Sequence, residues 1–264
     1  MPAEPPHTPT PTPTPKIRIR GLCKRFGDKV VLEGIDLDVM PGTSVVVIGG
    51  SGSGKSVLLK CILGLIEPDA GTIAIDGQVL TAANAAAARS RIGMLFQAGA
   101  LFDSLSVWEN VAFGLMAQHK ATRSEARTRA GDILRQVGLD PSVGDLSPAE
   151  LSGGMQKRVG LARAIASQPD ILFFDEPTTG LDPIMGAVID GLIVDCVKRL
   201  GSTAIAITHD MASATRIGDR AAMLFRGKLI WQGEAGALMQ SGNAMVDQFT
   251  HGRRDGPIQM ELRR

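Results

Sequence analysis

The chain has 264 residues, and its 28 lysine and arginine residues nearly balance its 27 aspartate and glutamate residues. This balance gives no global indication of a nucleic-acid partner or of an acidic binding surface. No stretch approaches the roughly 18 consecutive apolar residues that a membrane-spanning helix needs, and the N-terminus lacks the basic and then apolar layout of a secretion signal. We therefore expect a cytoplasmic protein that reaches a membrane only through a partner.

The segment 1–16 is rich in proline and threonine and begins MPAEPPHTPTPTPTP. It cannot bury apolar area, so we expect a disordered, extended tail there. From Ile17 onward, apolar runs alternate with helical stretches. Three of these runs have the two-residue period of half-exposed strands, namely Ile17–Arg20, Gly34–Val39 and Thr72–Asp76.

Three other runs are continuously apolar, namely Ser44–Ile48, Ile171–Phe174 and Thr203–Ile207. This pattern is typical of strands buried on both faces of a parallel sheet. Near the end of the chain, Ala221–Phe225 and Leu229–Trp231 flank a short turn and predict a hairpin. The sequence therefore predicts an α/β fold with a parallel sheet, N-terminal antiparallel strands and an inserted helical subdomain at about 98–168.

The three cysteines, Cys23, Cys61 and Cys196, lie far apart in the chain. Their positions match no metal-ligand spacing. We expect all three to be buried free thiols of a reducing compartment.

A glycine-rich segment directly after the strand at 44–48 has the spacing G-x-x-x-x-G-K-[ST] in every fixed position. It consists of Gly49, Gly50, Ser51, Gly52, Ser53, Gly54, Lys55 and Ser56. Glycines let several backbone N–H groups converge on phosphates, and the following helix directs its positive end at the same place. The pattern predicts that Lys55 reaches the β- and γ-phosphates of a nucleotide and that Ser56 binds Mg²⁺.

Two adjacent acids follow the strand at 171–174. A carboxylate at the carboxyl end of a buried strand beside a phosphate loop is suited to bind magnesium, directly or through water, and we assign this role to Asp175. Glu176 is suited to orient and deprotonate the attacking water. Alone, the pair could also be solvated turn residues, but beside the phosphate loop it predicts the second half of an ATP site.

The segment Leu151–Met155 has the sequence LSGGM and precedes a helix rich in basic and small residues. It resembles the signature motif of the ATP-binding-cassette (ABC) family, with Met155 where glutamine is usual. Ser152, Gly153 and Gly154 offer a hydroxyl and bare N–H groups at a helix N-terminus, which is an anion site. The resemblance implies a head-to-tail homodimer that sandwiches two ATP molecules, each bound by the signature of the opposite chain.

Other positions match motifs of the same family, from about Ile17 to beyond Gly233. By this resemblance, Gln97 senses magnesium and the attacking water, and His209 contacts the γ-phosphate. Asp182 lies in the D-loop that touches the opposite site. Phe26 falls where an aromatic residue packs against adenine, although a core role is the alternative for this side chain.

The resemblance implies ATP and Mg²⁺ as cofactors. The nucleotide-binding residues are expected to be Phe26, the phosphate loop from Gly49 to Ser56, Val57, Ser152, Gly153, Gly154 and Asp182. The expected catalytic residues are Lys55, Gln97, Glu176 and His209, and the expected metal ligands are Ser56, Gln97 and Asp175. The ABC ATPase domain is expected to cover residues 17–240, and residues 241–264 form a C-terminal extension.

Within the family, the segment Met94–Asp103 resembles the ATPase subunits of Mla/Mce-type lipid-transport systems, as do Asp182–Ile184 and the segment Gln248–Pro257. This resemblance implies transport of phospholipids between bacterial membranes from the cytoplasmic face of the inner membrane. The implied partners are an integral-membrane permease, an Mce-type substrate-binding protein and a small STAS-domain subunit. The C-terminal extension would help to hold the homodimer together; the equal alternative is that its basic residues, Arg253, Arg254, Arg263 and Arg264, belong to a frayed, solvated end.

By the same resemblance, an apolar stretch would line the groove that receives a permease helix. It comprises Leu101, Phe102, Leu105, Val107 and Trp108. The alternative is that these side chains form the core of the helical subdomain, and for Trp108 the two possibilities are equal.

Two other functions stay open at this point. One is an ABC importer ATPase for a different solute, such as an amino acid. The other is a soluble ATP-gated switch without a permease. The motifs predict ATP hydrolysis, whereas the cargo depends on the weaker resemblance around Gln97.

Overall fold

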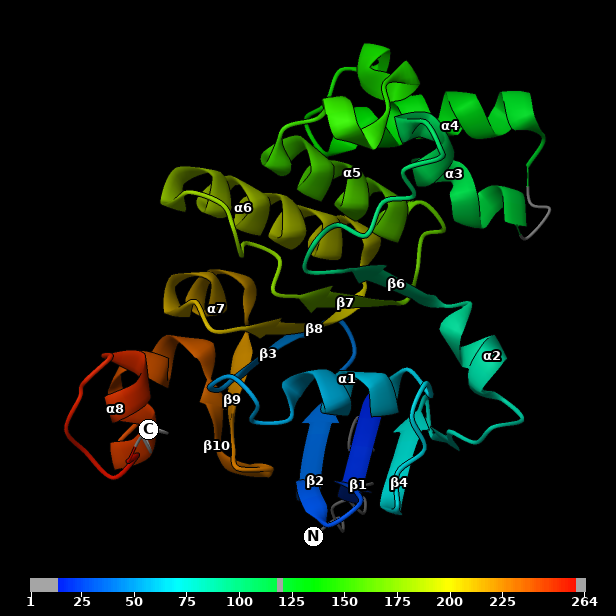
Figure 1. Ribbon diagram of the computed structural model, residues 1–264. Coiled ribbons are helices and arrows are strands. Elements are labelled where there is room, and N and C mark those ends of the chain that lie inside the picture. The colour runs from blue at the N-terminus through cyan, green and yellow to red at the C-terminus, as the bar shows by residue number, and fades with distance from the viewer. Residues whose placement is uncertain (1–13, 118–120, 260–264) are drawn as a thin grey trace, which may run out of the picture.

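Two β-sheets form the framework of the computed structural model, which describes residues 14–117 and 121–259 (Figure 1). The predicted tail at residues 1–16 therefore lies almost wholly outside the described residues. The smaller sheet is antiparallel, with the strand order β2-β1-β4-β5. Its strands are β1 (Ile17–Phe26), β2 (Lys29–Val39), β4 (Ala70–Ile75) and β5 (Gln78–Val79).

The larger sheet has six strands in the order β10-β9-β3-β8-β7-β6. All neighbouring strands are parallel except β10, which pairs with β9 in the antiparallel direction. The strands are β3 (Ser44–Ile48), β6 (Ile92–Leu95), β7 (Ile171–Asp175), β8 (Thr203–Thr208), β9 (Arg220–Phe225) and β10 (Lys228–Glu234). The parallel sheet and the antiparallel N-terminal strands confirm the predicted fold class.

Helices cover both faces of the larger sheet (Figure 1). The α-helices are α1 (Lys55–Ile62), α2 (Ala85–Arg89), α3 (Val107–Ala117), α4 (Arg123–Gln136), α5 (Gly153–Ile165), α6 (Pro183–Leu200), α7 (Met211–Ile217) and α8 (Ala244–Thr250). Short 3₁₀ helices occupy Pro141–Asp145, Pro148–Glu150 and Ala235–Gln240. Within the described residues, no helix combines the length and the apolar character needed to cross a membrane.

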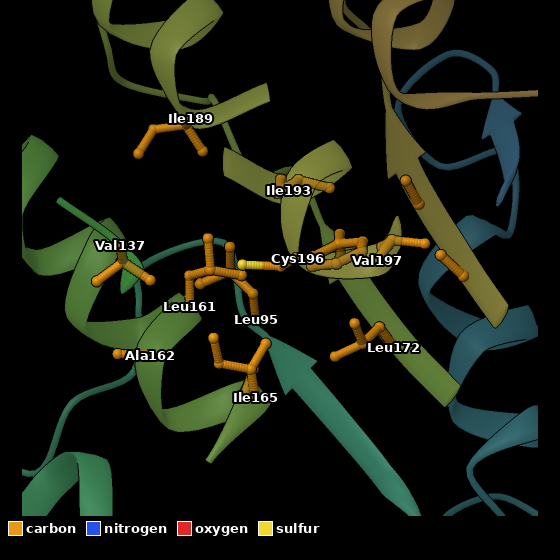
Figure 2. Close-up of a cluster of buried hydrophobic side chains, with 14 of the residues drawn as sticks. Leu95, Val137, Leu161, Ala162, Ile165, Leu172, Ile189, Ile193, Cys196 and Val197 are labelled. Carbon is orange, nitrogen blue, oxygen red and sulfur yellow. The ribbon is translucent and has the colours of Figure 1, made fainter. Parts of the chain in front are cut away.

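The side chains of the central strands alternate between two separate cores. Val46 and Ile48 of β3 belong to the core that packs against α5, α6 and α7, part of which surrounds Cys196 in Figure 2. Val45 and Val47 belong to the core that contains α1 and the smaller sheet. Because both faces of β3 are covered, every residue of the strand is buried, which is why its sequence is continuously apolar.

The first strand is longer than its sequence pattern predicts. The alternation ends at Arg20, whereas β1 continues to Phe26 and pairs with β2 across a tight turn. Gly21 has a φ of 56°, and the pairing with β2 shifts register between Ile19 and Leu22. This bulge breaks the two-residue period, so the second half of the strand has no recognisable pattern.

The hairpin predicted near the end of the larger sheet is confirmed as β9 and β10. Its turn consists of Arg226 and Gly227, with φ values of 46° and 80°. Two successive residues with positive φ are typical of the two-residue turn that matches the twist of antiparallel strands.

Two of the three cysteines are buried free thiols as expected, and one is not. Cys61 and Cys196 lie in the cores, and burial raises the pKa of Cys61 to about 11. Cys23 is only half-buried, because it lies beside the bulge of β1, where the sulfur accepts a hydrogen bond from the Gly34 N–H at 3.2 Å.

The carboxyl ends of four parallel strands lie at one edge of the larger sheet. β3 leads into Gly49, β6 leads toward Gln97, β7 ends at Asp175, and β8 leads into His209. Parallel strands place their carboxyl ends together, where α/β proteins commonly bind ligands. The fold therefore gathers residues that are far apart in the sequence.

Gly93 in β6 gives a test of how tightly α5 packs on the sheet. A methyl group on Gly93 would lie 2.1 Å from the Ala164 carbonyl oxygen and 2.9 Å from side-chain atoms of Leu172 and Pro169. Gly93→Ala should therefore lower the free energy of unfolding by roughly 1–3 kcal/mol or more, as measured by urea denaturation.

Gly191→Ala is the matched control. Gly191 is exposed in α6, and a methyl group there would meet no atom within 4 Å. Because alanine is favoured over glycine in helices by about 1 kcal/mol, this variant should be at least as stable as the wild type. Equal stability of the two variants would contradict the packing described here.

Candidate functional site

The phosphate loop joins β3 to α1 and packs closely against the backbone of neighbouring strands. A methyl group on Gly49 would lie 2.2 Å from the Leu224 carbonyl oxygen, and one on Gly54 would lie 2.8 Å from the Val31 carbonyl oxygen. Gly54 also has a φ of 109°, which residues with side chains rarely adopt. The loop therefore requires glycine at both positions.

Lys55 begins α1, whose N-terminus has no side-chain cap. The first N–H groups of a helix lack partners within the helix and attract anions. The buried Lys55 ammonium donates to the carbonyl oxygens of Gly49 at 2.7 Å and Gly50 at 3.0 Å. Burial lowers the pKa of Lys55, and the charges of Glu176 and Asp175 act in the opposite direction. A cation and helix N–H groups thus meet at one loop.

The acid pair lies at the end of β7, beside the phosphate loop. Glu176 has a φ of 48°, and its N–H donates to the Ile207 carbonyl of β8 at 2.8 Å. Burial raises the pKa of Asp175, as does the neighbouring Glu176, whereas nearby lysines including Lys55 lower it. The site therefore holds carboxylate charge in a place where a cation would stabilise it.

The Glu176 carboxylate has two side-chain partners. His209 Nδ1 lies 2.7 Å from Glu176 Oε2, and the Thr179 hydroxyl donates to the same oxygen at 3.1 Å. The ends of β7 and β8 thus place the carboxylate and the imidazole in direct contact. A carboxylate held in this way can accept a proton in a fixed direction.

These groups line one cavity of about 590 Å³. The lining consists of Gly50, Ser51, Gly52, Lys55, Ser56, Gln97, Asp175, Glu176, Ile207, His209 and Phe249. All the residues predicted to be catalytic or metal-binding lie in this set. Phe249 comes from α8, and no pattern in the sequence indicated that this helix reaches the cavity.

Several predicted nucleotide-binding residues do not line the cavity. In the phosphate loop these are Gly49, Ser53 and Gly54, and outside the loop they include Ser152, Gly153, Gly154 and Asp182. The Ser152 side chain caps α5, and the Asp182 side chain caps α6. The two helix caps are neighbours in space. A methyl group on Gly153, the residue after Ser152, would lie 4.0 Å from the side chain of Leu181, the residue before Asp182. The signature and the D-loop therefore form a second surface, separate from the cavity.

Phe26 and Val57 also lie outside the cavity lining. Phe26 is 49% exposed at the end of β1, which excludes a core role for it. The Lys24 ammonium lies over its ring at 5.5 Å from the centroid. Val57 packs against the core that contains α1. The roles of both residues toward a nucleotide stay predictions.

Lys157 is a site residue that the sequence analysis missed. It lies in α5 and is buried, and its ammonium donates to the carbonyl oxygen of Gln97 and, at 3.4 Å, to that of Glu176. In the sequence it stands in a run of polar residues after the signature, which is typical of a solvated helix face. Only the fold brings its ammonium to the main chain of two residues that line the cavity.

The comparison with protein-family models supplies the deciding observation. Residues 32–179, more than half of the chain, match the model described as ABC transporter. The match includes the phosphate loop, the signature and the acid pair. The chain belongs to the ABC transporter family.

Individual relatives agree with this family. The chain is 41% identical, over 92% of its length and 71% of the relative, to a probable ribonucleotide transport ATP-binding protein, mkl, of Mycobacterium leprae. It is 39% identical, over 93% of its length and 94% of the relative, to the intermembrane phospholipid transport system ATP-binding protein MlaF of Haemophilus influenzae. A solved dimeric ATP-binding cassette, MJ0796, in a post-hydrolysis state with ADP and Pi, is 30% identical with a TM-score of 0.76, over 83% of this chain and 98% of that structure.

The predicted family and enzyme class are thus confirmed. The chain is an ATP-binding, ATP-hydrolysing ABC subunit. In this ABC subunit, the predicted metal ligands are the carboxylate of Asp175, the hydroxyl of Ser56 and the amide of Gln97. The described residues contain no cluster of three or more His, Cys, Asp or Glu side chains that could hold an ion by themselves. Mg²⁺ at a nucleotide site typically takes one or two carboxylates together with phosphates and water, so these residues fit an ion that binds with the nucleotide.

The apolar stretch predicted to receive a permease divides into a buried and an exposed part. Trp108 is 5% exposed, and the guanidinium of Arg123 lies over its ring at 4.9 Å. Of the two possibilities for Trp108, its burial supports packing in the helical core over a place in the groove of the ABC subunit. Phe102 is 43% exposed and lies 4.6 Å from the ring of Phe113, which is also exposed and which the sequence analysis missed.

The electrostatics of the acid pair predict that removing the charge of Asp175 raises the free energy of unfolding. Because the pKa of Asp175 is raised, the folded protein disfavours its ionised form, and Asp175→Asn removes this penalty. Without nucleotide or metal, the variant should have a higher free energy of unfolding than the wild type at pH 7, as measured by urea denaturation.

The advantage should shrink as the pH falls through the raised pKa, because the wild-type carboxyl group then also becomes neutral. The variant should lose ATP hydrolysis at every pH. A less stable Asp175→Asn protein at pH 7 would contradict the electrostatic account.

Proposed function

We propose that this chain forms a homodimer whose ATP hydrolysis powers a transporter of phospholipids between bacterial membranes. The observation that carries the proposal is the cavity in which Lys55, Glu176 and His209 converge at the edge of the parallel sheet. The likeness to MlaF over nearly the whole of both chains supports the lipid cargo. Within that likeness, the Mla/Mce-like segment around Gln97 is the part that bears most directly on the cargo.

In the proposed mechanism, the phosphates of ATP lie in the loop Gly49–Ser56. Lys55 and the N–H groups of the loop neutralise their charge. Water attacks the γ-phosphorus, its proton passes to the Glu176 carboxylate, and the bond to the bridging oxygen breaks, which releases ADP and phosphate. His209 fixes the direction of the carboxylate and can donate to the γ-phosphate oxygens.

Mg²⁺ would be held by Ser56, Gln97 and Asp175, and it would neutralise charge on the phosphates. The raised pKa of Asp175 supports this assignment, because a bound cation stabilises the ionised carboxylate that burial disfavours. Ser56 and Gln97 line the same cavity as Asp175.

The residues outside the cavity support the proposed homodimer. Ser152, Gly154 and Asp182 offer anion-binding and capping groups on a second surface, so in the proposed dimer each chain presents them to the nucleotide of its partner. The dimeric state of the related cassette with ADP and Pi supports this arrangement.

The proposed transporter places this subunit on the cytoplasmic face of the inner membrane. A permease helix would pack on the exposed pair of Phe102 and Phe113, beside Leu101 and Leu105. An Mce-type substrate-binding protein and a STAS-domain subunit are the other partners that the resemblance implies.

A transporter ATPase for a different solute is the second candidate. The likeness to mkl, a probable ribonucleotide transport ATP-binding protein, favours this possibility. The cavity described here serves ATP in both cases, so the ATPase site cannot distinguish the two cargoes.

Glu176→Gln tests the assignment of the base. The amide cannot accept the proton of water, so ATP hydrolysis should fall by at least about a thousandfold while ATP still binds. The purified variant should form a stable dimer on addition of ATP, as measured by light scattering after gel filtration.

Lys55→Ala is the contrasting variant, because it should lose ATP binding itself and form no ATP-dependent dimer. Wild-type turnover in Glu176→Gln would disprove the role of this carboxylate. Unchanged nucleotide affinity in Lys55→Ala would disprove the role of the phosphate loop.

The cargo is tested by affinity purification of the tagged chain from detergent-solubilised membranes of its own organism, followed by protein and lipid mass spectrometry. We expect a permease, an Mce-domain protein and bound phospholipid. Recovery of a solute-binding protein without an Mce domain would favour the second candidate. Recovery of no permease would favour a soluble ATP-gated switch and would contradict both.

A further inference from the structure

Lys157 is a buried cation in the helix that follows the signature. The residue is 6% exposed, and an ammonium without partners is strongly disfavoured in a protein interior. It donates to the main-chain carbonyl oxygens of Gln97 and Glu176. Its partners are thus the backbones of two segments that line the ATP cavity.

These two carbonyl groups lie just beyond the ends of neighbouring strands. β6 and β7 are parallel and pair as far as Leu95 opposite Phe174. Past that point the ladder stops, so carbonyl groups there need donors from outside the sheet. The Lys157 ammonium serves as that donor for both Gln97 and Glu176.

The backbone of Glu176 depends on such support. Its φ of 48° is unfavourable for a residue with a side chain and persists only where the surroundings fix it. The N–H is held by the Ile207 carbonyl, and the carbonyl is held by Lys157. The direction of the carboxylate toward His209 follows from this backbone.

The same helix begins with the signature, about one turn before Lys157. Ser152 caps α5, and Lys157 follows Gly153 by four residues, which is about one helical turn. In the dimer of the proposed function, on which this inference rests, Ser152 contacts the nucleotide of the partner. One rigid helix then joins the partner's nucleotide to this chain's own catalytic backbone.

We propose that Lys157 is a positioning residue that holds the main chain of Gln97 and Glu176 against α5, so that closure of the signature on one nucleotide sets the catalytic carboxylate at the other. Lys157 touches neither water nor phosphate in this scheme. Its loss affects the hydrolysis step more than the binding of ATP.

The experiment compares Lys157→Met, which removes all donors, with Lys157→Arg, which keeps a cation. The full-length chain is assayed with ATP and Mg²⁺ for kcat and KM, and for equilibrium binding of a fluorescent ATP analogue. Lys157→Met should lower kcat by about tenfold or more, because a charged hydrogen-bond donor is lost, with binding changed by less than about threefold. Lys157→Arg should stay within about threefold of the wild-type kcat.

Lys198→Met is the control for the loss of a lysine, because Lys198 is exposed on α6. It should leave kcat unchanged. In the Glu176→Gln background, Lys157→Met should still form the ATP-dependent dimer, which a general folding defect would abolish. If Lys157→Met does not fold, Lys157→Gln takes its place. Its kcat should fall by more than that of Lys157→Arg and by less than the fall expected for Lys157→Met.

A wild-type kcat in Lys157→Met or Lys157→Gln would overturn the proposal, as would a parallel loss of ATP binding and dimerisation. Failure of the proposed function would look different. In that case the wild-type chain would not hydrolyse ATP, or Glu176→Gln would hydrolyse it normally.

Discussion

The site depends on one constraint, which is that parallel strands bring their carboxyl ends to a common edge. The phosphate loop, Gln97, the acid pair and His209 belong to distant parts of the chain and meet because they follow β3, β6, β7 and β8. Each strand has one core on each side, so a slip of one residue would exchange Val46 with Val47 between two differently shaped cores. The packing of both faces therefore fixes the edge at which the chemistry occurs.

The charges at this edge oppose the stability of the protein alone. Burial lowers the pKa values of Lys55 and Lys157 and raises that of Asp175, and each charge is only partly offset by its neighbours. Proteins retain such arrangements at functional sites. The Lys55 ammonium in the phosphate loop suits phosphate anions, and Asp175 suits a cation. The balance therefore fits a ligand that brings both signs of charge together, as ATP does with a divalent cation.

Sequence patterns predicted the elements whose environment is uniform along the chain. Ser44–Ile48 is buried throughout, so its composition alone indicates a central strand, and the phosphate loop is specified by glycines that the backbone requires. The patterns failed where tertiary contacts decide. The bulge at Gly21 hides half of β1, and Trp108 is buried by helices whose packing no local pattern describes. Lys157 has the same polar neighbours as a solvated lysine, and its partners come from other strands.

Helix α5 connects two parts of the molecule. It begins at the surface that carries the signature and the D-loop, and it then passes beside the ATP cavity. Its cap at Ser152 adjoins the D-loop outside the cavity, whereas Lys157 contacts the backbone that lines the cavity. A helix of this length moves as a unit, since its backbone hydrogen bonds leave little freedom within a turn. In the proposed dimer, Ser152 contacts the nucleotide of the partner chain. A displacement of Ser152 would therefore pass along the backbone of α5 to Lys157, and from there to the chain's own ATP cavity. The two ATP sites are linked by the stiffness of α5, and this link requires no change in the parallel sheet.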